Sequence, residues 1–397
     1  MDMEEVDWQT EEVQTGHAVF RFAETQVGAV TQVVEPIHAE SPQDWLTQQF
    51  SAQPDLFAVP IERDGGVVGL YPRARLGQKS GFFQAATLDR DLPPHGTIDA
   101  REPVNKVVAR LFADLRGTLT ENFLVYHNGH YFGIADLRGL VARSTLLREQ
   151  DLNRARELQE GTVDRSRLPT TDWERARYLK MAYEVGGDFY EELAWSDGTC
   201  LLSCFDVSGK GVSGSLVTSA IGGWLSAIRA LGGRAPDSLT FCRQLNDFLV
   251  ETLPLGTFVT GILFFLPAKI STGARMQTFN FGYASVYFQV RKENKVTGKV
   301  FKPNLPPLGI DGLVLDAQSA FLVPLETGLK VSTFSDGLMD LVNPSGQRYG
   351  EQSIRDFLGR SYRWTRGEFL SNLKAEIASF QKDAPQPDDI TILTVAF

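Results

Sequence analysis

The stretch FDVSGKGVSG, residues 205–214, places Asp206 at the end of an apolar strand and directly before a glycine-rich turn. Residues 200–207 are predicted as that strand, and residues 215–231 as the helix that follows the turn. A strand end is rigid, so it can project a side chain into a cleft. Glycine in the turn lets the backbone approach a bound group closely and offer its carbonyl as a ligand.

Three further acidic phrases also stand beside predicted strands. They are VGGDFYE with Asp188, FSDGLMD with Asp336, and PDDIT with Asp388 and Asp389. Each phrase alone is weak, because Asp-Gly at a strand end is usually only a turn. Together they offer dispersed oxygen ligands, which Mg²⁺ and Mn²⁺ prefer. A pair of such ions about 3.5–4 Å apart is a common arrangement for in-line phosphoryl displacement.

Residue types that would support other chemistries are missing from this part of the sequence. The last of the five histidines is His130, so the C-terminal two-thirds have no His base and no His metal ligand. This excludes His-based triads and Cys–His pairs there and makes zinc improbable. The three cysteines, Cys200, Cys204 and Cys242, lack metal-ligand spacing and are interpreted as small buried side chains.

Composition limits the partners and the compartment. The chain has 397 residues, enough for two or three domains, and a formal net charge of -10. An acidic chain is a poor ligand for nucleic acid or anionic membranes, so neither is expected as a partner. The N-terminus is acidic where a signal peptide would be basic, and the longest apolar run, residues 258–266, is too short to span a membrane. We expect a soluble, cytoplasmic protein.

Residues 169–397 alternate between strand and helix patterns and are predicted to form one domain. Adjacent strands without intervening helices favour antiparallel sheets with helices packed outside, which is an α+β sandwich. Besides the strand already described, strands are predicted at 181–190, 258–266, 276–281, 286–291, 329–334 and 390–397. Besides the helix already described, helices are predicted at 238–253, 351–360 and 368–382.

Residues 1–140 contain two similar phrases, which begin at Leu56 and Asn122. Each reads as strand, turn with glycine, short strand and helix start. The turns are Asp64-Gly65-Gly66 and His127-Asn128-Gly129, which are hairpin signals. The recurrence at about 66 residues suggests an internal duplication. Residues 28–142 resemble tandem CBS domains, which makes this an α/β regulatory domain with adenine nucleotide as a candidate ligand. Another α/β sensor or docking domain stays open as an alternative.

Residues 138–168 have leucines at mostly helical spacing and read as one helix, which forms most of a linker at 141–168. Pro169 is predicted to end the helix, because proline cannot continue it. The heptad is not strict, so a simple connecting helix and a homodimeric coiled coil both stay open.

From residue 155 to residue 397 the chain resembles the SpoIIE-type branch of the bacterial PPM protein phosphatases. The resemblance rests on the phrases ARELQ, GGDFY, DVSGKGVSG, FVTG, PPLG, SDGLMD, NPSGQRYG and DDIT. It implies a β-sandwich of antiparallel sheets flanked by helices. It also implies two bound divalent cations, Mn²⁺ or Mg²⁺, whose protein ligands are drawn from the acidic phrases.

The resemblance assigns a role to each site residue. Asp206 is expected to bridge both metals, with the backbone carbonyl of Val207 and the carboxylate of Asp188 on one of them. Asp336 and Asp388 are expected to hold the other. Asp389 is given a supporting role. Within the motif itself, Lys210 could steer phosphate or could be a solvated loop lysine, and Gly187 and Gly209 are expected to support the site through backbone conformation.

Two positions depart from the family pattern. Tyr283 stands where the family often has His, so a helper role cannot be carried over to it. Glu191 stands where the family often has Asp. Neither change removes an expected metal ligand, so we expect an active enzyme.

The sequence therefore predicts a protein serine/threonine phosphatase that acts through a metal-activated water and is regulated by its N-terminal domain. A phosphorylated STAS-type anti-sigma antagonist is the substrate class that the resemblance suggests. Three alternatives stay open: a catalytically weak protein that docks a phosphoprotein, a nucleotide sensor whose phosphatase is only its output, and a hydrolase of small phosphomonoesters.

Overall fold

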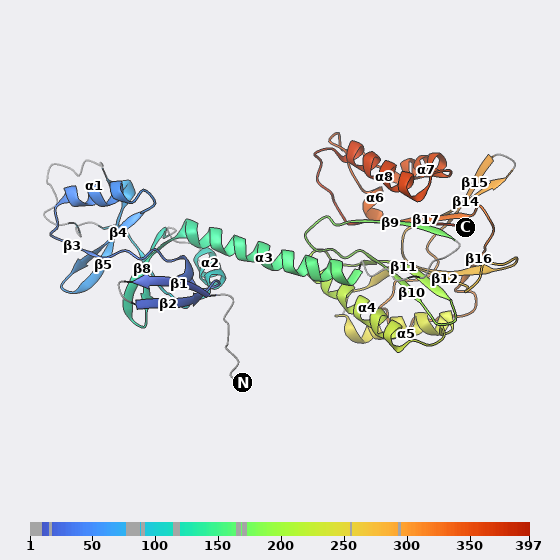
Figure 1. Cartoon of the computed structure of the whole chain (residues 1–397), viewed down its shortest axis with the longest axis horizontal. Coiled ribbons are helices and arrows are strands. Elements are labelled where there is room, and N and C mark those ends of the chain that lie inside the picture. Colours follow the sequence, from blue (N-terminus) through green and yellow to red (C-terminus); the bar gives the residue numbers. More distant parts are fainter. Residues whose placement is uncertain are drawn as a thin grey trace. The chain divides into compact units, whose positions relative to one another are not determined.

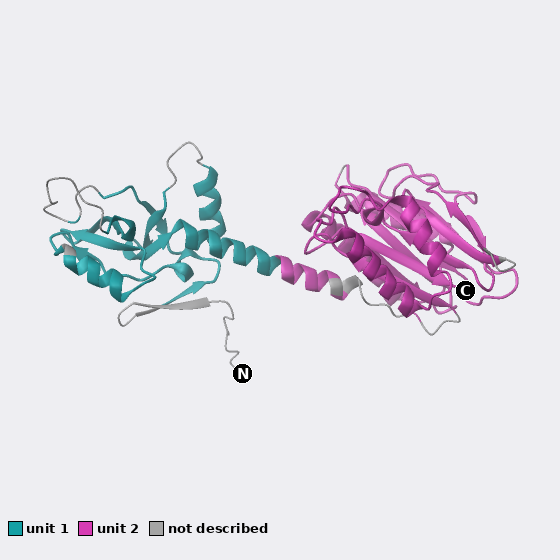
Figure 2. Cartoon of the chain, turned by 90° about the horizontal axis from the view of Figure 1, so that it is seen from above, with its two compact units in different colours: residues 1–151 teal, residues 152–397 magenta. Residues whose placement is uncertain are grey.

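The computed structural model describes residues 10–15, 18–76, 88, 92–113, 120–163, 168, 173–254, 256–292 and 295–397. The chain divides into two compact units, Met1–Asp151 and Leu152–Phe397 (Figure 2). The division falls inside helix α3, Leu137–Val163, which therefore contributes residues to both units. Among the described residues, no helix is both long enough and apolar enough to cross a membrane.

The first unit contains two copies of one strand–helix–strand–strand pattern (Figure 1). In each copy the first two strands pair in parallel and the last two pair antiparallel, giving a three-stranded sheet. The first copy consists of β3 (Ile37–His38), α1 (Gln43–Ala52), β4 (Ala58–Arg63) and β5 (Gly66–Pro72), and the second of β6 (Gly96–Asp99), α2 (Val104–Ala113), β7 (Asn122–His127) and β8 (His130–Asp136). The unit also contains the antiparallel hairpin of β1 (Thr10–Thr15) and β2 (Ala18–Ala23), the short helices η1 (Val27–Val30) and η2 (Arg73–Arg75), and the first part of α3.

Both turns that the sequence marked as hairpins join antiparallel strands. Asp64 and Gly65 have positive φ angles of 52° and 78°, and Asn128 and Gly129 have nearly the same values, 52° and 81°. Two successive positive φ angles give the turn that matches the twist of a tight hairpin. The strand β7 begins 64 residues after β4, so the structural repeat is slightly shorter than the spacing of the sequence phrases.

The second unit is built on two five-stranded antiparallel sheets. The strand orders are β10-β11-β12-β13-β16 in the first sheet and β15-β14-β17-β18-β9 in the second. The first sheet contains β10 (Phe189–Ala194), β11 (Cys200–Val207), β12 (Val259–Leu266), β13 (Arg275–Phe281) and β16 (Phe321–Pro324). The second contains β9 (Glu174–Lys180), β14 (Val286–Lys292), β15 (Lys295–Phe301), β17 (Lys330–Phe334) and β18 (Ile390–Ala396).

Helices cover the outer faces of both sheets (Figure 1). Helices α4 (Val212–Leu231) and α5 (Ser238–Thr252) share the core of the first sheet, and α7 (Gly350–Ser361) and α8 (Arg366–Gln381) share a smaller core with the second. The short helix α6, Asp336–Met339, follows β17. The predicted α+β fold of antiparallel sheets flanked by helices is thus confirmed.

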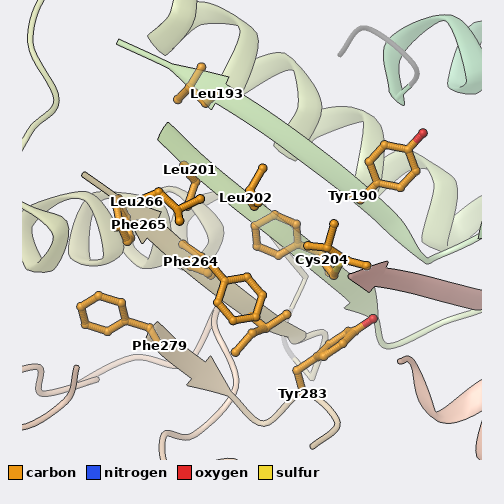
Figure 3. Packing of buried hydrophobic residues seen from close by; sticks show 14 of the residues in the cluster. Tyr190, Leu193, Leu201, Leu202, Cys204, Phe264, Phe265, Leu266, Phe279 and Tyr283 are labelled. Carbon is orange, nitrogen blue, oxygen red and sulfur yellow. The ribbon is translucent and has the colours of Figure 1, made fainter. Parts of the chain in front are cut away.

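The main core lies around the central strands of the first sheet (Figure 3). Leu201, Leu202 and Cys204 of β11 pack with Phe264 of β12 and are at most 1% exposed. Burying side chains of this size stabilises a fold by about 1.5–3 kcal/mol each. All three cysteines are free and buried, in agreement with their interpretation as packing residues.

One predicted strand is wrong. Residues 181–190 do not form a single strand, because β9 ends at Lys180 and β10 begins at Phe189. The two strands belong to different sheets, so the chain between them crosses from one sheet to the other. Gly186 and Gly187 lie in this crossing, where a Cβ atom on Gly186 would come within 2.2 Å of the carboxylate of Asp389. Close packing at the crossing therefore interrupts an otherwise strand-like sequence.

Candidate active site

The four aspartates that the sequence singled out lie at the ends of strands in both sheets of the second unit. Asp188 directly precedes β10, and Asp206 is the last residue but one of β11 in the same sheet. The other two aspartates lie beside strands of the second sheet. Asp336 is the second residue after the end of β17, and Asp388 is the second residue before the start of β18. The candidate active site is therefore formed where these ends of the two sheets come together.

Electrostatic coupling between the carboxylates indicates that they converge. Burial and, after it, the charges of Asp336 and Asp388 together raise the pKa of Asp206 to about 7. Burial, followed by the charge of Asp206, raises the pKa of Asp188 well above its usual range. Burial and the charge of Asp388 also raise the pKa of Asp336. Like charges gathered in a poorly solvated place need a counter-charge, which a cation can supply.

The donors present fit hard divalent cations. The Oδ2 atom of Asp188 is buried and has no hydrogen-bond partner among the described residues, so this oxygen is available as a ligand. Within the described part of the chain, no group of three or more His, Cys, Asp or Glu side chains is arranged to hold one metal ion, so the fit rests on the chemistry of the donors. Carboxylate and backbone carbonyl oxygens are the ligands that Mg²⁺ and Mn²⁺ prefer, and Mg²⁺ also keeps several waters. A structural zinc site would instead need four N or S ligands.

The glycines beside the site allow backbones to pack closely. A Cβ atom on Gly187 would lie 3.1 Å from the carbonyl oxygen of Val207 and 3.0 Å from that of Gly209. Gly209 has a φ of 134°, which residues with a side chain rarely adopt. The turn of Asp188 can thus lie directly on the turn that follows Asp206, and these glycines act through the backbone.

Lys210 makes a specific contact with one of the aspartates. Its Nζ atom lies 2.8 Å from Oδ2 of Asp388 and donates a second hydrogen bond of 2.8 Å to the carbonyl oxygen of Pro387. The hydrogen bond to Asp388 raises the pKa of Lys210. The lysine side chain is half exposed, so it places a positive charge at the rim of the site.

Sequence reasoning gave no role to Gln159, which lies near the end of α3. Its side chain is 2% exposed, although the helix around it is mostly polar and solvated. Its Nε2 atom donates to the carbonyl oxygen of Gly186 at 2.7 Å and to Oγ1 of Thr218 at 2.9 Å, and its Oε1 accepts from the amide of Gly186 at 3.2 Å. The only available signal was its place in the phrase ARELQ, because burial of one polar residue leaves no trace in hydrophobic periodicity.

Tyr283 is the second residue whose position the sequence could not give. It is 2% exposed and lies beside Cys204 in the core (Figure 3), and within the described residues its hydroxyl has no hydrogen-bond partner. Burial raises the pKa of Tyr283 well above its usual range, with further contributions from Cys204 and Asp188. The tyrosine that replaces the family histidine is therefore a neutral, buried neighbour of the carboxylates.

Comparison with known proteins identifies the second unit. The family model of stage II sporulation protein E (SpoIIE) matches residues 196–397. The structure of the SiaA-PP2C domain of Pseudomonas aeruginosa is 25% identical with a TM-score of 0.54, and the match covers 64% of this chain and 98% of that domain. A Bacillus subtilis structure with the PP2C phosphatase domain and a regulatory fragment of SpoIIE is 15% identical with a TM-score of 0.44, covering 57% of this chain and 64% of that one. No curated protein matches the chain.

The family match spans half of the chain and includes Asp206, Asp336 and Asp388. The match to the SiaA-PP2C domain covers almost the whole of that domain. The protein therefore belongs to the SpoIIE family, and it is a phosphoprotein phosphatase of the PP2C type.

Proposed function

We propose that this protein is a metal-dependent serine/threonine phosphatase that binds two divalent cations, Mn²⁺ or Mg²⁺. The proposed ligands are the carboxylates of Asp188, Asp206, Asp336 and Asp388 and the backbone carbonyl of Val207. The observation that carries the proposal is the convergence of four carboxylates, one of which is held at a pKa of about 7 by burial and by its neighbours. Such a cluster is costly unless cations neutralise it.

Divalent cations bound in such a site lower the pKa of water and neutralise charge on phosphoryl oxygens. The chain's own residues position the proposed ligands and place a positive charge beside them. Gly187, next to Asp188, packs against Val207, next to Asp206, so backbone contacts hold the two turns that carry these ligands against each other. Lys210 supplies a positive charge at the rim, where the phosphate of a substrate would enter. No His in this unit can act as a general base.

The first test is hydrolysis of para-nitrophenyl phosphate with Mn²⁺, Mg²⁺ or a chelator. We expect metal-dependent turnover in the wild type and a loss of at least about 100-fold in D206N, because a proposed metal ligand is removed. D383N is a matched control, because Asp383 is an exposed carboxylate five residues before Asp388. Metal-independent turnover, or a D206N variant as active as the wild type, would refute the dinuclear site. Binding of a phosphoprotein without turnover would favour the docking alternative.

We further propose that helix α3 regulates the site. The supporting observation is Gln159, whose amide binds both backbone groups of Gly186 and so connects α3 to the turn that carries Asp188. A change in the position or stability of the end of α3 would break these bonds and release the turn. The first unit would thereby influence catalysis through one continuous helix.

The nature of the first unit is part of this proposal. Its two copies of one strand–helix–strand–strand pattern support a tandem CBS pair, for which adenine nucleotide is the candidate ligand. Calorimetric titration of the full-length protein with ATP, ADP and AMP tests this directly, and the absence of binding by all three would refute it. Leu146 of α3 is 43% exposed, which supports pairing with a second copy of the chain. A phosphorylated STAS-type protein remains the proposed substrate, on the family resemblance alone.

A further inference from the structure

Asp389 differs from its neighbour Asp388 in every contact that it makes. Its side chain is buried, and the residue is 6% exposed. Its Oδ1 accepts a hydrogen bond of 2.7 Å from the amide of Ala182, and its Oδ2 accepts from the amides of Gly187 at 2.8 Å and Asp188 at 3.2 Å. Both carboxylate oxygens are therefore bound to backbone N–H groups of the crossing between β9 and β10.

The backbone of Asp389 is fixed as firmly as its side chain. Its carbonyl oxygen accepts a hydrogen bond of 3.1 Å from Oγ of Ser335, the residue directly before Asp336. Its amide donates to Oδ1 of Asp388 at 3.0 Å. Gly337 packs so closely that a Cβ atom there would come within 1.9 Å of the Asp389 carbonyl oxygen, and this position must stay glycine.

These contacts place Asp389 between the segments that carry three of the four candidate ligands. It binds the amide of Asp188 directly, it holds the residue before Asp336, and it adjoins Asp388. Asp389 is connected to the fourth candidate ligand, Asp206, through Gly187. The amide of Val207, next to Asp206, donates a hydrogen bond of 3.3 Å to the carbonyl oxygen of Gly187. A carboxylate that accepts several backbone hydrogen bonds has its orientation fixed.

We propose that Asp389 is a positioning residue, which holds the Gly186–Gly187–Asp188 turn against the other strand ends and binds no metal itself. Both of its oxygens accept hydrogen bonds from backbone amides, whereas Oδ2 of Asp188 has no partner in the part of the chain that the structure describes. The proposal rests on the proposed metal site, because its consequence is the alignment of Asp188 with Asp206. Replacing a residue that orients a metal ligand by hydrogen bonding typically weakens metal binding by about 10–100-fold.

The test is D389N in the full-length protein, followed by two readouts. Asparagine offers one acceptor oxygen where aspartate offers two, so at least one of the backbone bonds is lost. We expect amide exchange to accelerate at Gly187 or Ala182, and the Kd for Mn²⁺ measured by calorimetry to rise by about 10-fold or more with an unchanged number of bound ions. D388N, which removes a proposed ligand, should instead reduce the number of bound ions.

Two outcomes with D389N would overturn the proposal. D389N with wild-type exchange and Mn²⁺ affinity would mean that Asp389 positions nothing, and D389N with fewer bound ions would make it a ligand. The wild type alone also tests the idea if D389N does not fold. The metal-free protein must then protect the amides of Gly187 and Asp188 more strongly than those of the exposed residues Tyr183 and Glu184. A wild type that binds no Mn²⁺ yet protects these amides would refute the metal site and leave the hydrogen-bond assignment intact.

Discussion

At the scale of single residues, neighbouring acidic side chains divide their roles according to their partners. Asp388 is partly exposed and pairs with Lys210, whereas Asp389 points inward to three backbone amides. Glu191 and Glu192 of β10 show the same division, because Glu191 pairs with Arg229 of α4 and Glu192 with Arg175 and Arg177 of β9. Adjacent strand residues face opposite sides of a sheet, so consecutive acids reach different partners.

Glu191 should make stability depend on pH. Burial raises its pKa to about 7, against the opposing effect of Arg229, while an unfolded Glu titrates near 4.3. The folded state then binds more protons, so the stability from this group is complete below about pH 4.3 and is lost as pH rises through about 7. We expect E191Q to flatten this part of the profile, by an amount on the order of 3 kcal/mol at most.

Urea unfolding of wild type and E191Q from pH 4 to pH 8, both with chelator, measures the effect. The difference between the two proteins isolates Glu191, because Asp206 titrates in both. Two parallel profiles would show that Glu191 does not titrate in this range.

At the scale of elements, the segments between strands hold the site together more than the strands themselves. The crossing between β9 and β10 is bound from one side by Asp389 and from the other by Gln159 of α3. Helix α4 begins directly after the turn that follows Asp206. Its residue Thr218 accepts a hydrogen bond from the side-chain amide of Gln159. The position of Asp188 therefore depends on α3, on α4 and on Asp389, the residue directly before β18.

Replacement of Gln159 should change catalysis without unfolding the protein. Q159A removes the bonds to both backbone groups of Gly186, and it should alter kcat/KM by about 10-fold, since about 1.4 kcal/mol corresponds to that factor and two or more buried hydrogen bonds are lost. E157A is the control, because Glu157 lies two residues earlier on an exposed position of α3. Equal kcat/KM values for Q159A and E157A would show that α3 does not regulate the site through Gln159.

At the scale of the whole molecule, the two units are joined through α3, and each has its own core. The main buried clusters of the second unit involve residues from Trp173 onward, so this unit does not draw its core from the first. Independent cores allow one unit to change state while the other stays folded.

Deletion of residues 1–137 should therefore leave a folded phosphatase whose rate differs several-fold from that of the full chain. The reason is that α3 would no longer be anchored in the first unit, and its contact through Gln159 would change. Steady-state hydrolysis of para-nitrophenyl phosphate by both forms, at saturating Mn²⁺, measures this. Unchanged kinetics in the truncated form would mean that the first unit does not act on the site.

The sequence by itself determined the α+β class, most strands and helices of the second unit, and the four aspartates at strand ends. These follow from hydrophobic periodicity, glycine-rich turns and phrases that are local in the chain. It also marked both hairpin turns of the first unit, because Asp-Gly and Asn-Gly pairs adopt positive φ angles readily.

Only the tertiary structure decided which acidic residue faces which partner. Residues 181–188 read as strand, and their interruption depends on Asp389, some 200 residues later in the chain. The burial of Gln159 depends on Gly186 and Thr218, and that of Tyr283 on the packing around Cys204. Such contacts join residues far apart in sequence, and a buried hydrogen bond leaves no periodic pattern along the chain, so its effect appears only when the sheets and helices are assembled.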